Sequence, residues 1–224
     1  MLDLEEVKNA ASRISSLRRR KSVMQEQTSI SRVHNQEADV SATLDFLKLV
    51  LPPEGDHWYV AAVFNGGKVK HLWHRDRPSL GSCLLEADRS GATAYHACGI
   101  YRARDGGRKA KNSGGASSFW TDIDAGEGKQ YETAADALNA LLEFCHATGL
   151  PRPLCVGSGH GVHAYWPLLN LLDPETWKTY SAGLAALLRK HGIKHERTTD
   201  IASLLRPPGT HNRKREPRIV GVLQ

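Results

Sequence analysis

The sequence predicts an α/β (α+β) fold whose C-terminal half is a ferredoxin-like or RNA-recognition-motif (RRM) lobe with the element order βαββαβ. Two observations lead to this prediction. Short apolar segments of strand character and longer segments with helical apolar spacing follow one another in that order after residue 116. Gly149 and Gly192 stand where the two helices are expected to end, and Pro174 stands where the second begins. In this topology strands one and three are central, and strand four lies beside strand one.

The elements of this lobe follow from the apolar pattern. We expect strands at 118–124, 153–157 and 162–168, helices at 132–149 and 174–190, and an extended stretch at 193–200. Residues on one face of the first, third and last strands then converge. The prediction therefore brings the acids of the first strand toward His163 and the neighbourhood of Asp200.

Residues 41–115 are expected to form an N-terminal α/β lobe packed against the RRM-like lobe at 116–224. Its predicted elements are a helix at 42–51, a strand pair at 57–64 and 68–74, a helix at 79–89 and a strand at 93–102. Pro52 ends the first helix, and Asn65-Gly66-Gly67 is a hairpin turn. The basic, Gly- and Ser-rich segment 102–118 is expected to be a mobile boundary between the lobes.

Residues 1–40 are separable by composition, and we expect them to form a helical extension. They carry apolar residues at helical spacing, then the basic run Arg18–Lys21, then a polar stretch. The basic run suits phosphate contacts, although a solvated helix end is the simpler interpretation.

Composition is that of a globular protein: 40% of the 224 residues are hydrophobic and 24% are charged. No apolar run approaches the roughly 20 residues of a membrane span, and there is no signal peptide. The four cysteines are scattered without a C-x-x-C pair, which disfavours a zinc knuckle and a disulfide framework and predicts the reducing cytoplasm. The net charge of +6 favours a polyanionic partner.

The segment "SSFWTDIDAGEGK" places two acids one residue apart at the end of an apolar run. If the run is a strand, Asp122 and Asp124 point to one face while Phe119, Thr121 and Ile123 point to the other. Two carboxylates that share a face repel each other unless a cation or a proton lies between them. The simpler alternative is a strand that runs into an acidic, solvated turn.

The segment "VGSGHGVHAYW" combines small residues with a histidine on the following strand. Glycines permit close backbone approach, and turn amides with the Ser158 hydroxyl suit phosphate oxygens. His163 and Tyr165 share a face opposite Val162 and Ala164, so the imidazole is expected on the side of the acids. A plain hairpin turn and a surface histidine are the alternatives.

A third segment, "TTDIASLLRPPGTHNRK", follows near the C-terminus. Arg206, Arg213 and Lys214 surround a rigid Pro-Pro-Gly turn, which suits an anionic ligand. Asp200 is either part of the same site or the cap of the short turn that follows it. A solvated basic loop is the alternative for the cations.

Together these segments resemble, in content and order, the archaeo-eukaryotic primase superfamily, especially the primase-polymerases of phages and plasmids. The D-x-D on a strand appears as "DID", the S-G-x-G-x-H signature as "SGHGVH", and the third acid with its R-x-P-G-T-x-N-x-K-like run as "DIASLLRPPGTHNRK". The match covers Phe119 to Lys214, and residues 41–224 would be the catalytic core.

The resemblance implies a DNA primase or DNA polymerase that makes or extends primers on single-stranded DNA. Two divalent metal ions, Mg²⁺ or Mn²⁺, would activate a primer 3′-hydroxyl and stabilise the leaving pyrophosphate. The partners implied are a single-stranded DNA template, ribo- or deoxynucleoside triphosphates and, as a candidate, a replicative helicase. The implied metal ligands are Asp122, Asp124 and Asp200, and the implied nucleotide contacts are Ser158, His163, Arg206 and Lys214.

Two departures from the family pattern stand out. Many relatives carry a zinc-binding insertion, for which this sequence has no ligand cluster. Phage and plasmid relatives often continue into an accessory domain and a helicase, whereas this chain ends at Gln224, so it is either a stand-alone core or an excerpt. The role of His160, at the variable position of the signature, stays open.

Two other classes of function remain possible. A noncatalytic RRM-like nucleic-acid-binding module would stack bases on aromatic residues of the central strands, where Trp120 and Tyr165 are the candidates. Another two-metal enzyme, a nucleotide cyclase or a nuclease, would use the same acids. A rolling-circle endonuclease needs two histidines one residue apart, and "HGVH" has the wrong spacing.

Overall fold

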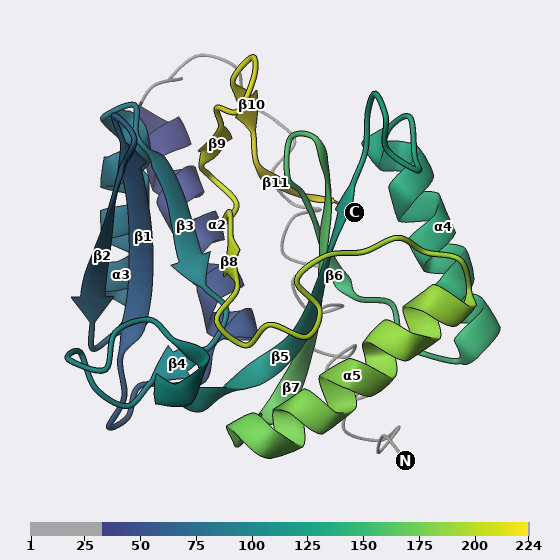
Figure 1. Cartoon of the computed structure of the whole chain (residues 1–224). Coiled ribbons are helices and arrows are strands. Elements are labelled where there is room, and N and C mark those ends of the chain that lie inside the picture. Colours follow the sequence, from purple (N-terminus) through teal and green to yellow (C-terminus); the bar gives the residue numbers. More distant parts are fainter. Residues whose placement is uncertain (1–32, 224) are drawn as a thin grey trace.

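A computed structural model describes residues 33–223 of the chain, with side chains from Val40 onward. It is a mixed α/β structure of two larger antiparallel sheets and four helices, with the C-terminal segment running between the two halves (Figure 1). The expected helical extension and its basic run lie almost entirely outside the described residues. Within residues 33–223, none of the helices has the length and apolar character that crossing a membrane requires.

The first half is a four-stranded sheet covered by two helices. Its elements are α2 (Val33–Val50), β1 (Tyr59–Asn65), β2 (Lys68–His74), α3 (Arg77–Arg89) and β3 (Thr93–Ala97). The strand order is β2-β1-β3-β8, in which β8 (Leu204–Leu205) comes from the C-terminal segment. Gly66 and Gly67 have φ angles of 55° and 76°, which the two-residue hairpin turn between β1 and β2 requires.

The second half is a five-stranded sheet with the order β11-β6-β7-β5-β4. Its elements are β4 (Ile100–Tyr101), β5 (Ser113–Asp124), α4 (Ala134–Thr148), β6 (Leu154–Gly157), β7 (Gly161–Leu172), α5 (Pro174–Lys190) and β11 (Gly221–Leu223). A short 3₁₀ helix (Ala110–Asn112) precedes β5, and β9 (His211–Asn212) and β10 (Arg218–Ile219) form a small ribbon.

Local sequence explains both helices of this half. Thr133 and Asp136 form a reciprocal capping box at the start of α4, and Gly149 ends the helix with a left-handed φ of 71°. Asp173 caps α5 by accepting hydrogen bonds from two backbone amides, ahead of Pro174 in the first turn. The predicted helices at 132–149 and 174–190 are thus confirmed.

The predicted RRM-like strand order is confirmed in its centre and modified at its edge. The order β6-β7-β5 corresponds to strands two, three and one. In place of a fourth strand, the stretch 193–200 makes one antiparallel bridge, in which Asp122 and Glu196 exchange backbone hydrogen bonds of 3.0 and 2.8 Å. Arg197 directly after it has φ 64°, a left-handed conformation that takes the chain out of strand geometry.

The predicted mobile boundary at 102–118 is wrong for its last residues, because β5 already begins at Ser113. Ser117 and Ser118 are buried, and both hydroxyls donate to the Val50 carbonyl, at 3.3 and 2.8 Å. A Cβ on Gly115 would lie 2.1 Å from the Leu172 carbonyl oxygen. Small residues that suggest a flexible linker here allow close packing of a buried strand.

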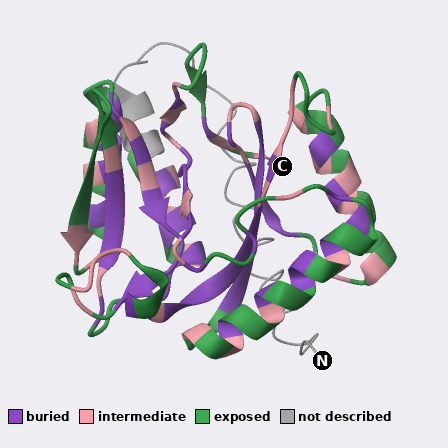
Figure 2. Cartoon of the chain, in the orientation of Figure 1, coloured by how far each residue is buried: buried purple, intermediate pink, exposed green. Residues whose placement is uncertain are grey.

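Neither predicted domain boundary coincides with a gap between elements. Position 40/41 falls inside α2, and position 115/116 falls inside β5. The C-terminal segment also joins both halves, because β8 pairs with β3 of the first sheet and β11 pairs with β6 of the second. One apolar core runs through both, with Phe46 of α2 packed edge-on against Tyr165 of β7 at 5.2 Å. The central strands are buried, whereas β2 and the outer faces of α4 and α5 are exposed (Figure 2).

Candidate active site

A row of polar side chains crosses the second sheet at the end of β5. Asp122 lies opposite His163 on β7, and on its other side it pairs with Glu196. Residues directly opposite each other in antiparallel strands project to the same face, so the three side chains share that face. Asp124 follows two residues later on the same face, opposite Gly161. The expected meeting of Asp122, Asp124 and His163 on one face agrees with this register.

Gly161 lets β7 lie close against the backbone of β5 beside Asp124. A Cβ at this position would lie 2.3 Å from the Ile123 carbonyl oxygen, so only glycine fits there. The carboxylate of Asp124 therefore has no side chain opposite it on β7.

Asp122, Asp124 and Glu196 form what we call the acidic wall. The Asp122 side chain is 19% exposed. Burial, together with the neighbouring charges of Asp124 and Glu196, raises the pKa of Asp122 to about 7. Lys129 neutralises part of this charge, because its ammonium lies 2.5 Å from an Asp124 carboxylate oxygen. The negative charge of the wall is thus only partly compensated, and a bound cation would relieve the repulsion that remains.

The donor set fits a magnesium or manganese ion. In residues 33–223 no three His, Cys, Asp or Glu side chains are close enough to hold a metal as they stand. Mg²⁺, however, is usually bound by one or two carboxylates together with water and substrate phosphate oxygens. Asp122 and Asp124 supply carboxylates of that kind on one face.

The turn between β6 and β7 is locked against the C-terminal segment. The side-chain amide of Asn212 donates a hydrogen bond to the Ser158 carbonyl at 2.7 Å. The backbone amide of Ser158 donates to the Gly161 carbonyl at 2.9 Å. Gly159 has φ 88°, and a Cβ there would lie 2.9 Å from Cβ of Asn212. The glycines of the "SGHG" turn therefore serve close packing with the segment that carries Asn212.

His163 is a buried, neutral imidazole. It is 2% exposed, so the alternative of a surface histidine is excluded. Burial, and then the positive charge of Arg206, lowers the pKa of His163 to about 3. Its Nε2 lies 3.6 Å from an Asp122 carboxylate oxygen, and its Nδ1 has no hydrogen-bond partner in the described structure. The side chain can donate or accept a hydrogen bond without carrying a charge.

Arg206 is a buried cation without an ion pair among the described residues. It is 5% exposed, its guanidinium donates to the Tyr95 hydroxyl, and its Cζ lies 4.5 Å from the Tyr95 ring centroid. The buried Nε has no partner. Lys214 and Arg215 are exposed nearby, and together the three cations form what we call the basic wall. Its charge is available to an anion.

Two cavities meet at Asp122, Asp124 and Lys129. The smaller cavity, of about 170 Å³, is lined by the basic wall together with Ser158 and His163. The larger cavity, of about 630 Å³, is lined by Glu196 together with Arg189 and Lys194. Gln130 braces the larger cavity, because its side chain donates to the Gly192 carbonyl and accepts from the Lys194 amide, both at 2.7 Å.

Six of the seven residues proposed from the sequence line the smaller cavity: Asp122, Asp124, Ser158, His163, Arg206 and Lys214. Asp200 lines neither cavity. It is exposed, and its carboxylate accepts a hydrogen bond of 3.0 Å from the Ala202 amide, which is the capping role weighed as its alternative. Glu196, which lines the larger cavity, was not among the site residues predicted from the sequence. It could have been found as an acid within the stretch 193–200, which was expected to lie beside β5.

Arg213, the other cation of the Pro-Pro-Gly segment, is turned away from both cavities toward the helix α3, where it pairs with Asp88. Its neighbours in the chain, Asn212 and Lys214, line the smaller cavity.

The aromatic residues of β5 and β7 do not form a base-stacking platform. Trp120 and Tyr165 are fully buried. Trp120 stacks on Trp177 with ring centroids 4.6 Å apart and donates to the Arg197 carbonyl at 3.0 Å. RRM-type recognition of bases needs exposed aromatic faces. The two rings are therefore not available to stack on bases.

The comparisons with known proteins agree with this architecture. No family model and no curated protein matches the sequence. Among solved structures, the chain is similar to the archaeo-eukaryotic primase (AEP) domain of the cyanophage S-2L primase-polymerase, with a TM-score of 0.58 and 18% identity over 84% of this chain and 89% of that one. It is also similar to primase RepB′, with a TM-score of 0.54 and 14% identity over 83% of this chain and 56% of that one.

A second RepB′ structure, the catalytic domain in complex with initiator DNA, matches with a TM-score of 0.54 and 14% identity over 83% of this chain and 84% of that one. At these identities the likeness concerns the fold. The resemblance seen in the sequence is confirmed at that level, and the chain has the fold of an archaeo-eukaryotic primase-type catalytic core.

Proposed function

We propose that this chain is the catalytic core of a DNA primase-polymerase, which joins nucleotides on a single-stranded DNA template. One observation carries the proposal: Asp122 and Asp124 of the acidic wall and the unpaired basic wall line a single cavity. A phosphoryl-transfer site needs this combination, because the cations neutralise the charge of the triphosphate and the acids would hold the metal ions that activate the attacking hydroxyl. The names of the similar structures, a primase-polymerase and a primase bound to initiator DNA, agree with it.

In the proposed site, the smaller cavity takes the triphosphate of the incoming nucleotide. Arg206 offers an unpaired charge, and Lys214 adds a second cation at the rim. The Ser158 hydroxyl and the neutral His163 imidazole orient phosphate oxygens by hydrogen bonding. Because His163 is neutral, its contribution is directional and not a net charge.

The acidic wall takes the metal ions. Mg²⁺ or Mn²⁺, when bound there, would neutralise the phosphates and make the 3′-hydroxyl a better nucleophile. We assign the ligands to Asp122, Asp124 and Glu196, and no longer to Asp200, because Glu196 faces Asp122 across the bridge while Asp200 caps its own turn. Lys129 forms an ion pair with Asp124 beside this site.

The larger cavity takes the 3′-terminal nucleotide of the primer. In an in-line displacement the attacking hydroxyl and the leaving pyrophosphate lie on opposite sides of the phosphorus. If the smaller cavity holds the triphosphate, the hydroxyl approaches from the larger cavity, which meets the first at the acids. Arg189 and Lys194 then contact the phosphates of the primer strand.

The test is template-directed synthesis on single-stranded DNA, with ribo- or deoxynucleotides, Mg²⁺ or Mn²⁺, and with or without a primer. Products that lengthen along the template support the proposal. Tight DNA binding without synthesis under every condition would favour the binding module. A cyclic nucleotide product or a shortened template would instead identify a cyclase or a nuclease.

The ligand assignment has a matched pair of variants, Glu196→Gln and Asp200→Asn. Each replaces a carboxylate by its amide of the same size. We expect Glu196→Gln to lower synthesis at least about a hundredfold and Asp200→Asn to stay within about threefold of the parent. The reverse order of effects would restore Asp200 as the third ligand.

A further inference from the structure

We propose that Asp88, on α3 of the first half, is a positioning residue for the nucleotide pocket of the second half. It holds the segment Pro207–Lys214 by His211 and Arg213, and thereby sets the position of Asn212 and Lys214 in the smaller cavity. This inference rests on the proposed function, because it assigns a role in nucleotide binding.

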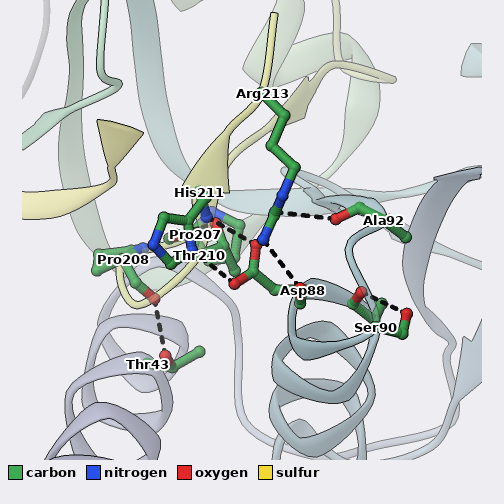
Figure 3. A network of polar contacts seen from close by, with 10 residues as sticks. Thr43, Asp88, Ser90, Ala92, Pro207, Pro208, Thr210, His211 and Arg213 are labelled. Atoms are coloured by element: carbon green, nitrogen blue, oxygen red, sulfur yellow. Dashed lines mark hydrogen bonds and ion pairs between the residues drawn. The ribbon is translucent and has the colours of Figure 1, made fainter. Parts of the chain in front are cut away.

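The contacts of Asp88 form a dense network (Figure 3). One carboxylate oxygen accepts hydrogen bonds from the His211 amide, at 2.8 Å, and from the Arg213 guanidinium. The other accepts from Nδ1 of His211 at 2.8 Å. Arg213 also donates to the carbonyls of Asp88 and Ala92, at 2.9 and 3.1 Å. The carboxylate therefore ties two residues to the end of α3.

Asp88 occupies an unfavourable place for a charge unless it is paired. It is 4% exposed and lies in the last turn of α3, where the helix dipole disfavours an anion. Burial acts to raise the pKa of Asp88, yet the hydrogen bonds from Arg213 and His211 hold it below the usual range. The charge is thus stabilised by the segment that it holds.

Side chains of the segment 211–214 point alternately toward α3 and toward the pocket, so the contacts of Asp88 with His211 and Arg213, which we call the Asp88 clamp, are coupled to the smaller cavity. Successive residues of an extended chain point to opposite sides. His211 and Arg213 point toward α3, whereas Asn212 and Lys214 line the smaller cavity. Asn212 also holds the Ser158 carbonyl and accepts from the Lys214 amide, at 2.7 and 3.2 Å. A shift of His211 and Arg213 would therefore move the nucleotide-binding residues between and after them.

A second anchor fixes the start of the segment. The Thr43 hydroxyl of α2 donates to the Pro208 carbonyl at 2.7 Å, and the Thr210 hydroxyl donates to the Pro207 carbonyl at 2.8 Å (Figure 3). With this end fixed, removal of the Asp88 charge would release chiefly the part that carries Asn212 and Lys214. A local change in nucleotide binding is expected.

The experiment compares Asp88→Asn with a matched control, Glu54→Gln. Glu54 forms an ion pair of 2.8 Å with Arg77 at the other end of α3 and lines neither cavity. We expect Asp88→Asn to raise KM for the nucleotide about tenfold or more, with kcat and template affinity within about threefold of the parent. Glu54→Gln should leave KM unchanged.

Coupling to Lys214 distinguishes positioning from general stability. If Asp88 acts through the segment, the effects of Asp88→Asn and Lys214→Gln on nucleotide KM are less than additive in the double variant. Additive effects, or a lowered melting temperature with unchanged KM, would overturn the proposal. Should Asp88→Asn fail to fold, Arg213→Gln removes one part of the clamp and leaves His211 on Asp88, and the same shift in KM is expected.

Equilibrium binding separates this inference from the proposed function. A nonhydrolysable α,β-methylene deoxynucleoside triphosphate with Mn²⁺ is titrated into parent and variants. If the parent binds the analogue but synthesises nothing, the proposed function fails, and about tenfold weaker binding by Asp88→Asn still supports the inference. If the parent does not bind the analogue, or if Asp88→Asn binds it as tightly as the parent, the inference is wrong.

Discussion

The acidic wall and the basic wall meet at the smaller cavity, which Asp122 and Asp124 share with the cations, but the two walls are built differently. The acidic wall is held by main-chain hydrogen bonds, because Asp122 and Glu196 occupy paired backbone positions next to β7. The basic wall depends on side chains from distant elements, since Tyr95 holds Arg206 and Asp88 holds the segment before Lys214. Charge can therefore be removed from the acids without moving the backbone, whereas the cations depend on residues outside their own loop.

The strongest test of this difference is removal of single charges from the acidic wall. We expect Asp122→Asn or Asp124→Asn to lower primer synthesis at least about a hundredfold while the fold is retained, because an amide does not replace an anionic metal ligand. Mn²⁺ affinity, synthesis and circular dichroism are measured on the same proteins. Synthesis at the parent rate in either variant would remove these acids from the metal site.

A smaller effect is expected from His163, which lies between the two walls. His163→Ala should lower kcat/KM for the nucleotide about ten- to a hundredfold, because the oriented hydrogen bond from the imidazole to the phosphate is removed, and leave template binding unchanged. His146→Ala, at an exposed position of α4, is the matched control. Nucleotide kinetics equal to those of the parent would show that His163 has only a packing role.

The acidic wall should also make the metal-free protein pH-sensitive. The pKa of Asp122 is about 7 in the folded chain against a usual value of 3.8, so the folded state retains a proton that the unfolded state releases. The contribution of Asp122 to the free energy of unfolding is therefore fully present below about pH 4. It is lost as the pH rises through about 7, which lowers the free energy of unfolding by up to about 4 kcal/mol.

In EDTA, Asp122→Asn should therefore match the parent near pH 4 and unfold at a higher denaturant concentration near pH 8. Chemical denaturation across this range measures the difference, with Asp200→Asn as the exposed control. A parent and an Asp122→Asn variant with parallel pH profiles would contradict the electrostatic description of the wall.

The smallest effect is expected from the N-terminal extension, whose basic run Arg18–Lys21 would add positive charge for DNA binding. Deletion of residues 1–32, which stops before α2, should preserve synthesis at saturating template and weaken DNA binding. For every DNA phosphate that the extension neutralises, its deletion should flatten the log–log salt dependence of binding by roughly one unit. Replacement of Arg18–Lys21 by glutamine isolates the basic run, and loss of synthesis with folding intact would place the extension within the catalytic unit.

Much of the second half was predictable because its signals are local. Strand alternation alone put Asp122 and Asp124 on one face, and the pairing with β7 then brought His163 opposite Asp122. Caps and glycines marked α4 and α5 within a few residues of their ends. Periodicity and capping act over a few residues, so the sequence carries them without knowledge of the fold.

Tertiary structure decided which distant residues meet. Glu196 and Asp200 are both acids of the stretch 193–200, and the sequence pattern does not distinguish them. The backbone bridge between Glu196 and Asp122 of β5 places Glu196, and not Asp200, at the larger cavity. Ser113–Ser118 resemble a linker until burial against Val50 makes them a strand. Arg213 lies among the cations of its loop, but a buried carboxylate 125 residues away turns it aside. Such pairings depend on competition for burial and charge compensation between remote segments, which local patterns do not encode.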